Sequence, residues 1–239
     1  MDKKIYTSDY YVAFLDVLGA QYFMSKDDNQ FLYDLNNIYT EAINNLLKEV
    51  KNNLKQKIHV KIFSDNILLA IKINKKDSNT KSKLEHLINL AGLIQVTALK
   101  YGHLLRGAIT KGKFFIKNDT TETFVYGKAL VDAYSIESHN AIYPRIIINC
   151  LSENISEESY KQDIDGLYYV NYYHFSYNKN LEPIKQLLLN KLSSEKEQKV
   201  KQKIMWSISY HNTYCKEEFP KIYDYIPYIT DEEIKNTKN

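Results

Sequence analysis

The stretch YYVAFLDVLG, residues 10–19, decides the fold of this 239-residue chain. Residues 11–15 form an unbroken run of aromatic and aliphatic side chains, which is typical of a central strand covered on both faces. Asp16 stands where the run would continue, and Gly19 follows three residues later. Strand ends in α/β sheets collect ligands, and a turn with glycine offers backbone N–H groups to an anion. The alternative is that Asp16 only caps the next helix.

A second stretch, HVKIFSDNILLAIKI at residues 59–73, predicts a β-hairpin. Two strand-like runs meet at Ser64-Asp65-Asn66, and Asp-Asn suits a tight turn, so Asp65 is expected at or beside the tip. The flanks are too apolar for a surface ribbon. We therefore expect the hairpin inside the sheet, with Asp65 next to the end of the first strand. Two such carboxylates can share hard divalent cations, and Mg²⁺ fills its remaining positions with phosphate oxygens and water.

Composition and charge narrow the class of protein. Charged residues are 26% and apolar residues 44% of the chain, as in ordinary soluble globular proteins. The apolar runs are too short to cross a membrane and the N-terminus has no signal-peptide core, so we expect a cytoplasmic protein without a membrane partner. A net charge of +3 is too small for an extended nucleic-acid surface. Cys150 and Cys215 lie far apart without a CxxC motif, which disfavours a disulfide scaffold and a structural zinc site.

Arginine usage is more informative than net charge. Only two of the 32 basic residues are arginines, Arg106 and Arg145. Because lysine serves elsewhere for general positive charge, a retained arginine indicates bidentate hydrogen bonding to an acid or a phosphate. Arg106 interrupts the apolar run 104–109, where an unpaired guanidinium would be costly. The alternative for either residue, and the favoured one for Arg145, is a buried structural ion pair.

The remaining elements follow from periodicity and turn signals. Apolar side chains at three- and four-residue steps predict helices over 27–55 and 83–101, the second ended by Gly102. Other expected features are a polar linker at 74–82, a hairpin over 103–116 that turns at Lys111-Gly112, a loop at 117–123, a strand, glycine break and helix over 124–138, strands at 143–150 and 166–175, one or two helices over 181–211, and an extended or loosely packed tail at 220–239. This order predicts an α/β (α+β) fold with a ferredoxin-like βαββαβ core, an extra hairpin strand and a mainly helical C-terminal extension.

With this order of elements, the strings FLDVLG, FSDN, LRGAITKG, YGKALVDAYSIES and YPRIII resemble the class III nucleotidyl cyclase catalytic domain. The resemblance covers residues 8–175 and is closer to a divergent bacterial branch, the pyrimidine nucleotide cyclases of the Pycsar anti-phage defence. KIMWSISYHN and GLYYVNYY resemble the C-terminal extension of that branch. The resemblance implies a catalytic domain at residues 1–180 and a helical extension at 181–239 packed on it.

The resemblance also implies an activity. A cytoplasmic homodimer with composite active sites would convert UTP, or else CTP, into the 3′,5′-cyclic nucleotide (cUMP or cCMP) and pyrophosphate. The product would act on a separate effector that senses the cyclic nucleotide. No nucleic acid or membrane is implied as a partner.

Individual residues receive roles from the same resemblance. Asp16 and Asp65, with the backbone carbonyl of Val17, match the positions that hold two Mg²⁺ or Mn²⁺ ions per site. Arg106 is expected to stabilise charge on the transferred phosphoryl group. The expected substrate-binding residues are Ser64, the base-facing Lys61, and Leu18, Gly19 and Ala20, whose N–H groups would hold the triphosphate together with that of Val17. Lys61 is alternatively one solvated member of an alternating strand.

The chain also departs from the class. Purine cyclases carry an Asn and an Arg on the helix after the glycine that matches Gly127. Val131 and Ser135 stand at those positions and cannot replace them, which favours Arg106 as the cation and disfavours an adenylate or guanylate cyclase. Two further interpretations stay open. One is a different two-metal nucleotidyl transferase on the same core, and the other is a non-catalytic module for nucleotide binding or dimerisation.

Overall fold

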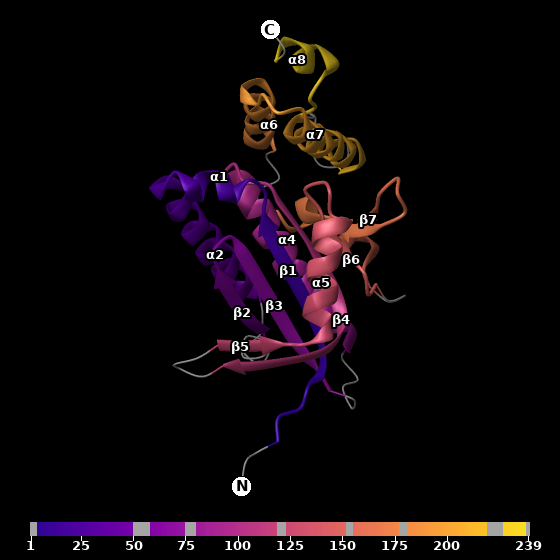
Figure 1. Cartoon of the computed structure of the whole chain (residues 1–239). Helices are drawn as coiled ribbons and strands as arrows, with labels where there is room; N and C mark the ends of the chain where they lie inside the picture. Colours follow the sequence, from indigo (N-terminus) through magenta and orange to yellow (C-terminus); the bar gives the residue numbers. More distant parts are fainter. Residues whose placement is uncertain are drawn as a thin grey trace.

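A central mixed sheet with helices on both faces forms the body of the computed structural model, which describes residues 4–49, 58–74, 80–118, 123–151, 155–176, 181–218 and 227–237 (Figure 1). The strands lie in the order β2-β3-β1-β4-β6-β8-β7, and β5 pairs with β4 outside this order. The strands are β1 (Ser8–Val17), β2 (Ile58–Phe63), β3 (Asn66–Ile73), β4 (Leu105–Asn118), β5 (Thr123–Tyr126), β6 (Ile146–Ile148), β7 (Tyr160–Gln162) and β8 (Tyr168–Val170). The helices are α1 (Ala20–Ser25), α2 (Asn29–Glu49), α4 (Thr80–Lys100), α5 (Lys128–His139), α6 (Glu182–Ser194), α7 (Gln198–Glu218) and α8 (Asp231–Asn236), with short 3-10 turns at Glu157–Ser159 and Tyr172–Phe175.

The predicted ferredoxin-like core is confirmed. β1, α2, β2, β3, α4 and β4 follow one another in the chain, and their strands pair antiparallel in the order β2-β3-β1-β4. Alternate residues of β1 enter different cores. Ala13 and Leu15 pack with α2 and α4, whereas Val12 belongs to a second cluster with Ala129 of α5. Burial on both faces explains why the sequence of β1 is continuously apolar.

The expected turn at Lys111-Gly112 is wrong. β4 runs through both residues as one strand paired with β1, and the extra strand β5 instead pairs with the far end of β4. A Cβ built at Gly112 would lie 3.4 Å from the Cβ of Ala129 on α5, at the short end of ordinary van der Waals contact. Gly112 therefore lies inside a strand that packs against this helix, and its presence in the sequence was not a turn signal.

Helix and tail boundaries also differ from expectation. The single helix predicted over 27–55 is preceded by an unexpected short helix, α1, and the described part of α2 ends at Glu49. Gly102 has the expected left-handed conformation after α4, with φ of +84°. The strand predicted over 166–175 is confined to β8. A loosely packed tail is wrong for 227–237, where α8 begins at a Thr230 capping box and Ile229 is buried.

Some expectations lie partly outside the described residues, namely the linker at 74–82, the loop at 117–123 and the tail segment before residue 227. None of the described helices combines the length and the apolar character needed to cross a membrane.

Arg145 forms a buried ion pair, as the favoured interpretation of this residue predicted. Its side chain is 1% exposed and contacts the carboxylates of Asp163 and Asp165. Asp163 also accepts a hydrogen bond of 2.9 Å from Nε1 of Trp206 on α7. Arg145 therefore joins the start of β6 to the C-terminal helices and has a structural role.

Replacing Arg145 with alanine is expected to lower the free energy of unfolding by roughly 3 kcal/mol, because it leaves the half-buried Asp163 without its cation. Urea denaturation measures the change. The matched control is Lys161→Ala, which removes the more exposed Lys161–Glu217 pair and is expected to cost under about 1 kcal/mol. Equal effects of the two substitutions would contradict the structural role of Arg145.

Candidate active site at the ends of β1 and β4

Strand register places three polar residues in one row across the sheet. Asp16 is paired with Asn66 of β3 on one side and with Arg106 of β4 on the other. Cross-strand pairs share a face of the sheet, so the three side chains lie on the face covered by α5. The row lies at the end of β1, close to α1 in Figure 1.

The β2–β3 hairpin brings Asp65 to the same place. Phe63 pairs with Asn66, so the connecting loop consists of Ser64 and Asp65 alone. The backbone N–H of Val17 donates a hydrogen bond of 3.3 Å to the carbonyl of Asp65, which fastens this loop to the end of β1. The structure thus joins Asp65 to the strand that carries Asp16, as the two-strand argument predicted.

The two aspartate side chains interact directly. Burial raises the pKa of Asp16, Arg106 lowers it, and the charge of Asp65 together with a hydrogen bond between the two carboxyl groups raises it again. Such a charge effect and hydrogen bond require the two carboxyl groups to be neighbours. The two acids therefore meet although α1, α2 and β2 separate them in the sequence. Their role in binding metal stays a prediction.

Arg106 has acids on two sides. Its Nε donates to Oδ2 of Asp16 at 3.1 Å and lies 2.6 Å from Oε1 of Glu137 on α5. The Nε–H bond points to Asp16, so Oε1 of Glu137 has no aligned hydrogen-bond donor among the described residues. Arg106 therefore has the acid partner that its buried position predicted, and it has two, Asp16 and Glu137.

Glu137 is the site residue that sequence reasoning missed. Its side chain is 3% exposed, and burial raises its pKa to about 7, with Arg106 lowering it and Asp16 and Asp65 raising it. The available signal was spacing. Glu137 continues the buried stripe of Ala129 and Ala133 at four-residue steps, which directs an acid from α5 toward the sheet.

The turn after β1 offers fewer free N–H groups than expected. The N–H of Val17 is bonded to Asp65 and that of Leu18 donates to the carbonyl of Leu104 at 2.8 Å. Of the four N–H groups expected to hold the triphosphate, those of Val17 and Leu18 are therefore already used by the sheet. Gly19, with φ of +80°, and Ala20 at the start of α1 are the two that stay candidates.

Two other expected residues, Lys61 and Ser64, lie on elements next to the acids. Lys61 pairs with Leu68, which pairs with Phe14, so Lys61 is on the same face as Asp16 and two strands away from it. Ser64, at the hairpin tip, donates to the sulfur of Met24 on α1 at 3.2 Å. The roles of both residues in substrate binding stay predictions.

The acids fit a divalent cation that takes its remaining ligands from a phosphate. No three His, Cys, Asp or Glu side chains in the described part of the chain are grouped so as to hold a metal ion by themselves. Mg²⁺ is commonly held by one or two carboxylates together with phosphate oxygens and water. The adjacent carboxyl groups of Asp16 and Asp65 supply the ligands that such a site takes from the protein.

Comparison with solved structures identifies the fold. The dimeric guanylyl cyclase domain of a RhoGC fusion protein from Blastocladiella emersonii is 14% identical, with a TM-score of 0.51, and the alignment covers 70% of this chain and 98% of that one. The catalytic core of a rhodopsin-guanylyl cyclase with converted specificity, in complex with ATPαS, is 14% identical with a TM-score of 0.50 over 70% and 97% of the two chains. No protein-family model and no curated protein sequence matches. The chain therefore has the fold of nucleotide cyclase catalytic domains.

Asp65→Asn is expected to lower the pKa of Asp16 in metal-free protein, because it removes the neighbouring negative charge that raises this pKa. Carbon-13 NMR titration of the aspartate carboxyl groups measures the change. Asp132→Asn, on the exposed side of α5, is the matched control and should leave the pKa of Asp16 unchanged. An Asp16 titration insensitive to residue 65 would show that the two carboxyl groups do not interact.

Proposed function

We propose that this protein is a metal-dependent pyrimidine nucleotide cyclase that converts UTP, or else CTP, into the 3′,5′-cyclic nucleotide and pyrophosphate. The observation that carries the proposal is the meeting of Asp16 and Asp65 beside Arg106 at the end of β1, in a fold shared with guanylyl cyclase domains. A nucleoside triphosphate needs both features, because its phosphates bind through cations and its reaction develops negative charge on the transferred phosphoryl group.

In this proposal the two aspartates, with the carbonyl of Val17, hold Mg²⁺ or Mn²⁺. Two such ions, when bound, would lower the pKa of the ribose 3′-OH and neutralise charge on the triphosphate. Arg106 contacts Asp16 and Glu137 through Nε, which leaves the two terminal nitrogens of its guanidinium to donate to the phosphoryl oxygens. Glu137 would fix the orientation of that guanidinium.

Two features support a pyrimidine over a purine substrate. The motif strings resemble the pyrimidine nucleotide cyclases of anti-phage defence, and α5 lacks the Asn and Arg of purine cyclases. Val131 and Ser135, which stand at those positions, are both exposed on α5. We further propose that the product is an antiviral second messenger that acts through a separate effector.

An exposed apolar surface beside the site supports a homodimer with composite active sites. Phe63 and Tyr134 are about half exposed, and their rings lie 6.4 Å and 5.7 Å from that of Phe14 on β1. Val131, one turn before Tyr134 on α5, is 65% exposed. A second copy of the chain that covers these side chains would also close the open side of the site. A monomer in sedimentation equilibrium at micromolar concentration would remove this part of the proposal.

The direct test is to incubate the purified protein with each of the four ribonucleoside triphosphates and Mn²⁺ and to identify the products by mass spectrometry. We expect a cyclic pyrimidine mononucleotide and pyrophosphate. Products linked by phosphodiester bonds between nucleotides would instead identify a different nucleotidyl transferase. A raised melting temperature without release of pyrophosphate would identify a non-catalytic nucleotide-binding module.

Asp16→Ala and Asp65→Ala should each abolish formation of the cyclic nucleotide, because each removes one of the carboxylates proposed to hold metal. Pyrophosphate release measures turnover, and circular dichroism checks the fold. Asp132→Ala is the control, since Asp132 pairs with Lys128 on the exposed side of α5. Undiminished activity of either site variant would rule out the metal assignment.

Arg106→Ala should lower kcat about 100- to 1000-fold, the usual effect of removing a group that stabilises transition-state charge. Arg106→Lys should restore part of this loss, because lysine keeps the charge but not the planar fork. A variant as fast as the parent would mean that Arg106 only stabilises the fold.

Mixing Asp16→Ala with Arg106→Ala protein tests whether the two residues serve one site. Asp16 and Arg106 are in contact within one chain. In a mixed dimer each chain therefore carries one of the two substitutions, and neither site has both residues. We expect no activity to return on mixing. Recovery on mixing would show that Arg106 serves the site of the partner subunit instead.

A further inference from the structure

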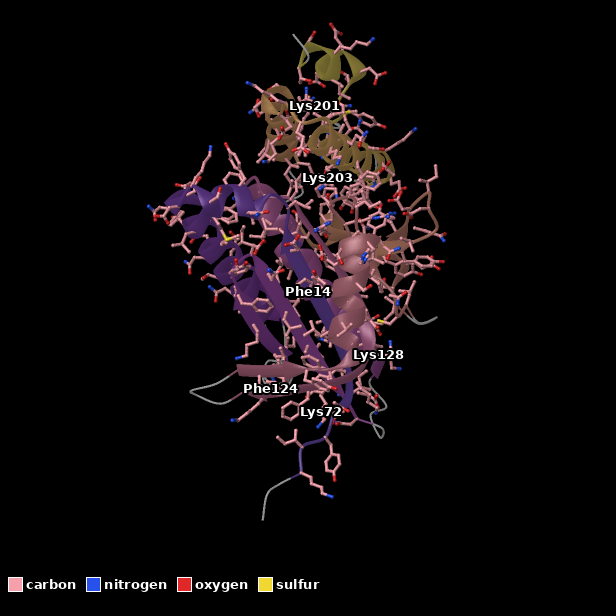
Figure 2. The ribbon with its side chains drawn as sticks, in the orientation of Figure 1. Phe14, Lys72, Phe124, Lys128, Lys201 and Lys203 are labelled. Carbon is pink, nitrogen blue, oxygen red and sulfur yellow. The ribbon has the colours of Figure 1, made fainter. Side chains whose placement is uncertain are left out.

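Lys203, on the C-terminal helix α7, is a half-buried cation close to the candidate active site. Figure 2 shows it on the side of α7 nearest the sheet, whereas Lys201 lies on the far side of this helix. The difference follows from helix geometry, because residues two apart point about 200° away from each other. α7 therefore directs these two lysines, both partly buried, to different sides of the helix, and Lys203 is the one on the side nearest the sheet.

The position of Lys203 is fixed by the residues around it. Ile204 and Ser207, both buried, and the partly buried Trp206 anchor this part of α7. Trp206 donates to Asp163 and stacks on Tyr143, with ring centroids 6.0 Å apart and planes 9° apart. One turn further along, the hydroxyl of Tyr210 donates to the side chain of Asn171. These contacts hold the backbone under Lys203 in one place.

The charge of Lys203 is coupled to the site. Burial lowers its pKa, the charge of Arg106 lowers it further, and the charges of Glu197 and Asp16 raise it. No carboxylate in the described part of the chain lies within ion-pair distance of its ammonium group. Arg106, in contrast, already has Asp16 and Glu137 as partners. Lys203 is thus a cation near the acids that lacks an ion-pair partner of its own.

We propose that Lys203 reaches from the C-terminal extension to the Asp16–Arg106 site of its own chain and binds the phosphates of the nucleoside triphosphate. This inference rests on the proposed function. A lysine suits the role because a flexible ammonium is a point charge that follows phosphate oxygens without demanding a planar fork. It also gives the extension a role at the site, since α7 then contributes a substrate contact as well as packing.

Two measurements test the proposal. The first is binding of inorganic tripolyphosphate with Mg²⁺ by isothermal titration calorimetry, and the second is KM for the nucleoside triphosphate that is turned over. Lys203→Ala should weaken both by about 10- to 100-fold, the usual effect of losing one charged hydrogen bond. Lys203→Arg should retain most of the affinity. Lys201→Ala, on the opposite side of the helix, is the matched control and should behave as the parent.

The outcomes separate this proposal from the proposed function. If Lys203→Ala matches Lys201→Ala in both measurements while Asp65→Ala is inactive, the Lys203 assignment alone is overturned. If Lys203→Ala lowers the melting temperature but leaves tripolyphosphate binding unchanged, its role is structural and the assignment is also overturned. If the parent protein neither binds tripolyphosphate nor turns over any of the four triphosphates, the proposed function itself fails.

Discussion

The hydrogen-bonded register of β1 with β3 and β4 is the constraint on which the candidate site depends. It places Asn66, Asp16 and Arg106 in one row, and the two-residue hairpin loop then sets Asp65 beside them. A slip of one residue would turn Asp16 to the opposite face, into the core formed with α2 and α4. The long apolar run of β1 prevents such a slip, because its side chains fill two different cores. Packing energy thus holds the site in register.

The site is electrostatically incomplete in the protein alone. Two carboxyl groups, those of Asp16 and Glu137, contact one guanidinium, and a third, that of Asp65, lies beside Asp16. Asp16 and Glu137 have raised pKa values because burial and mutual repulsion are not offset by Arg106. Added positive charge would lower the energy of this arrangement. A divalent cation beside the acids supplies such charge, and a bound triphosphate then brings the excess negative charge that Lys203 would meet. In the proposed complex the acids would hold the cation, the cation would hold the triphosphate, and Lys203 would contact the negative charge that remains on the phosphates.

The C-terminal helices depend on the sheet through a separate buried network. Arg145 at the start of β6 binds Asp163, Asp163 binds Trp206, and Trp206 packs among aromatic residues of β8 and α7. Tyr173 and Tyr210 stack within this cluster, with ring centroids 5.0 Å apart. Tyr169, Tyr172 and Tyr173 are therefore part of the core. Both arginines of the chain have acid partners. One arginine fastens the extension to the sheet, and the other lies in the candidate site.

The sequence by itself determined the ferredoxin-like core, the β2–β3 hairpin and the meeting of Asp16 with Asp65, because these follow from local periodicity and turn chemistry. It did not reveal the continuous β4, since Gly112 resembles a turn residue until α5 is seen to pack against it. It also did not identify Glu137 or Lys203. Each lies on a helix whose spacing predicts a buried face, but which part of the sheet that face meets depends on contacts between distant segments. Only the tertiary structure decides such neighbours, because the packing of helices against the sheet brings together charges that the chain keeps far apart.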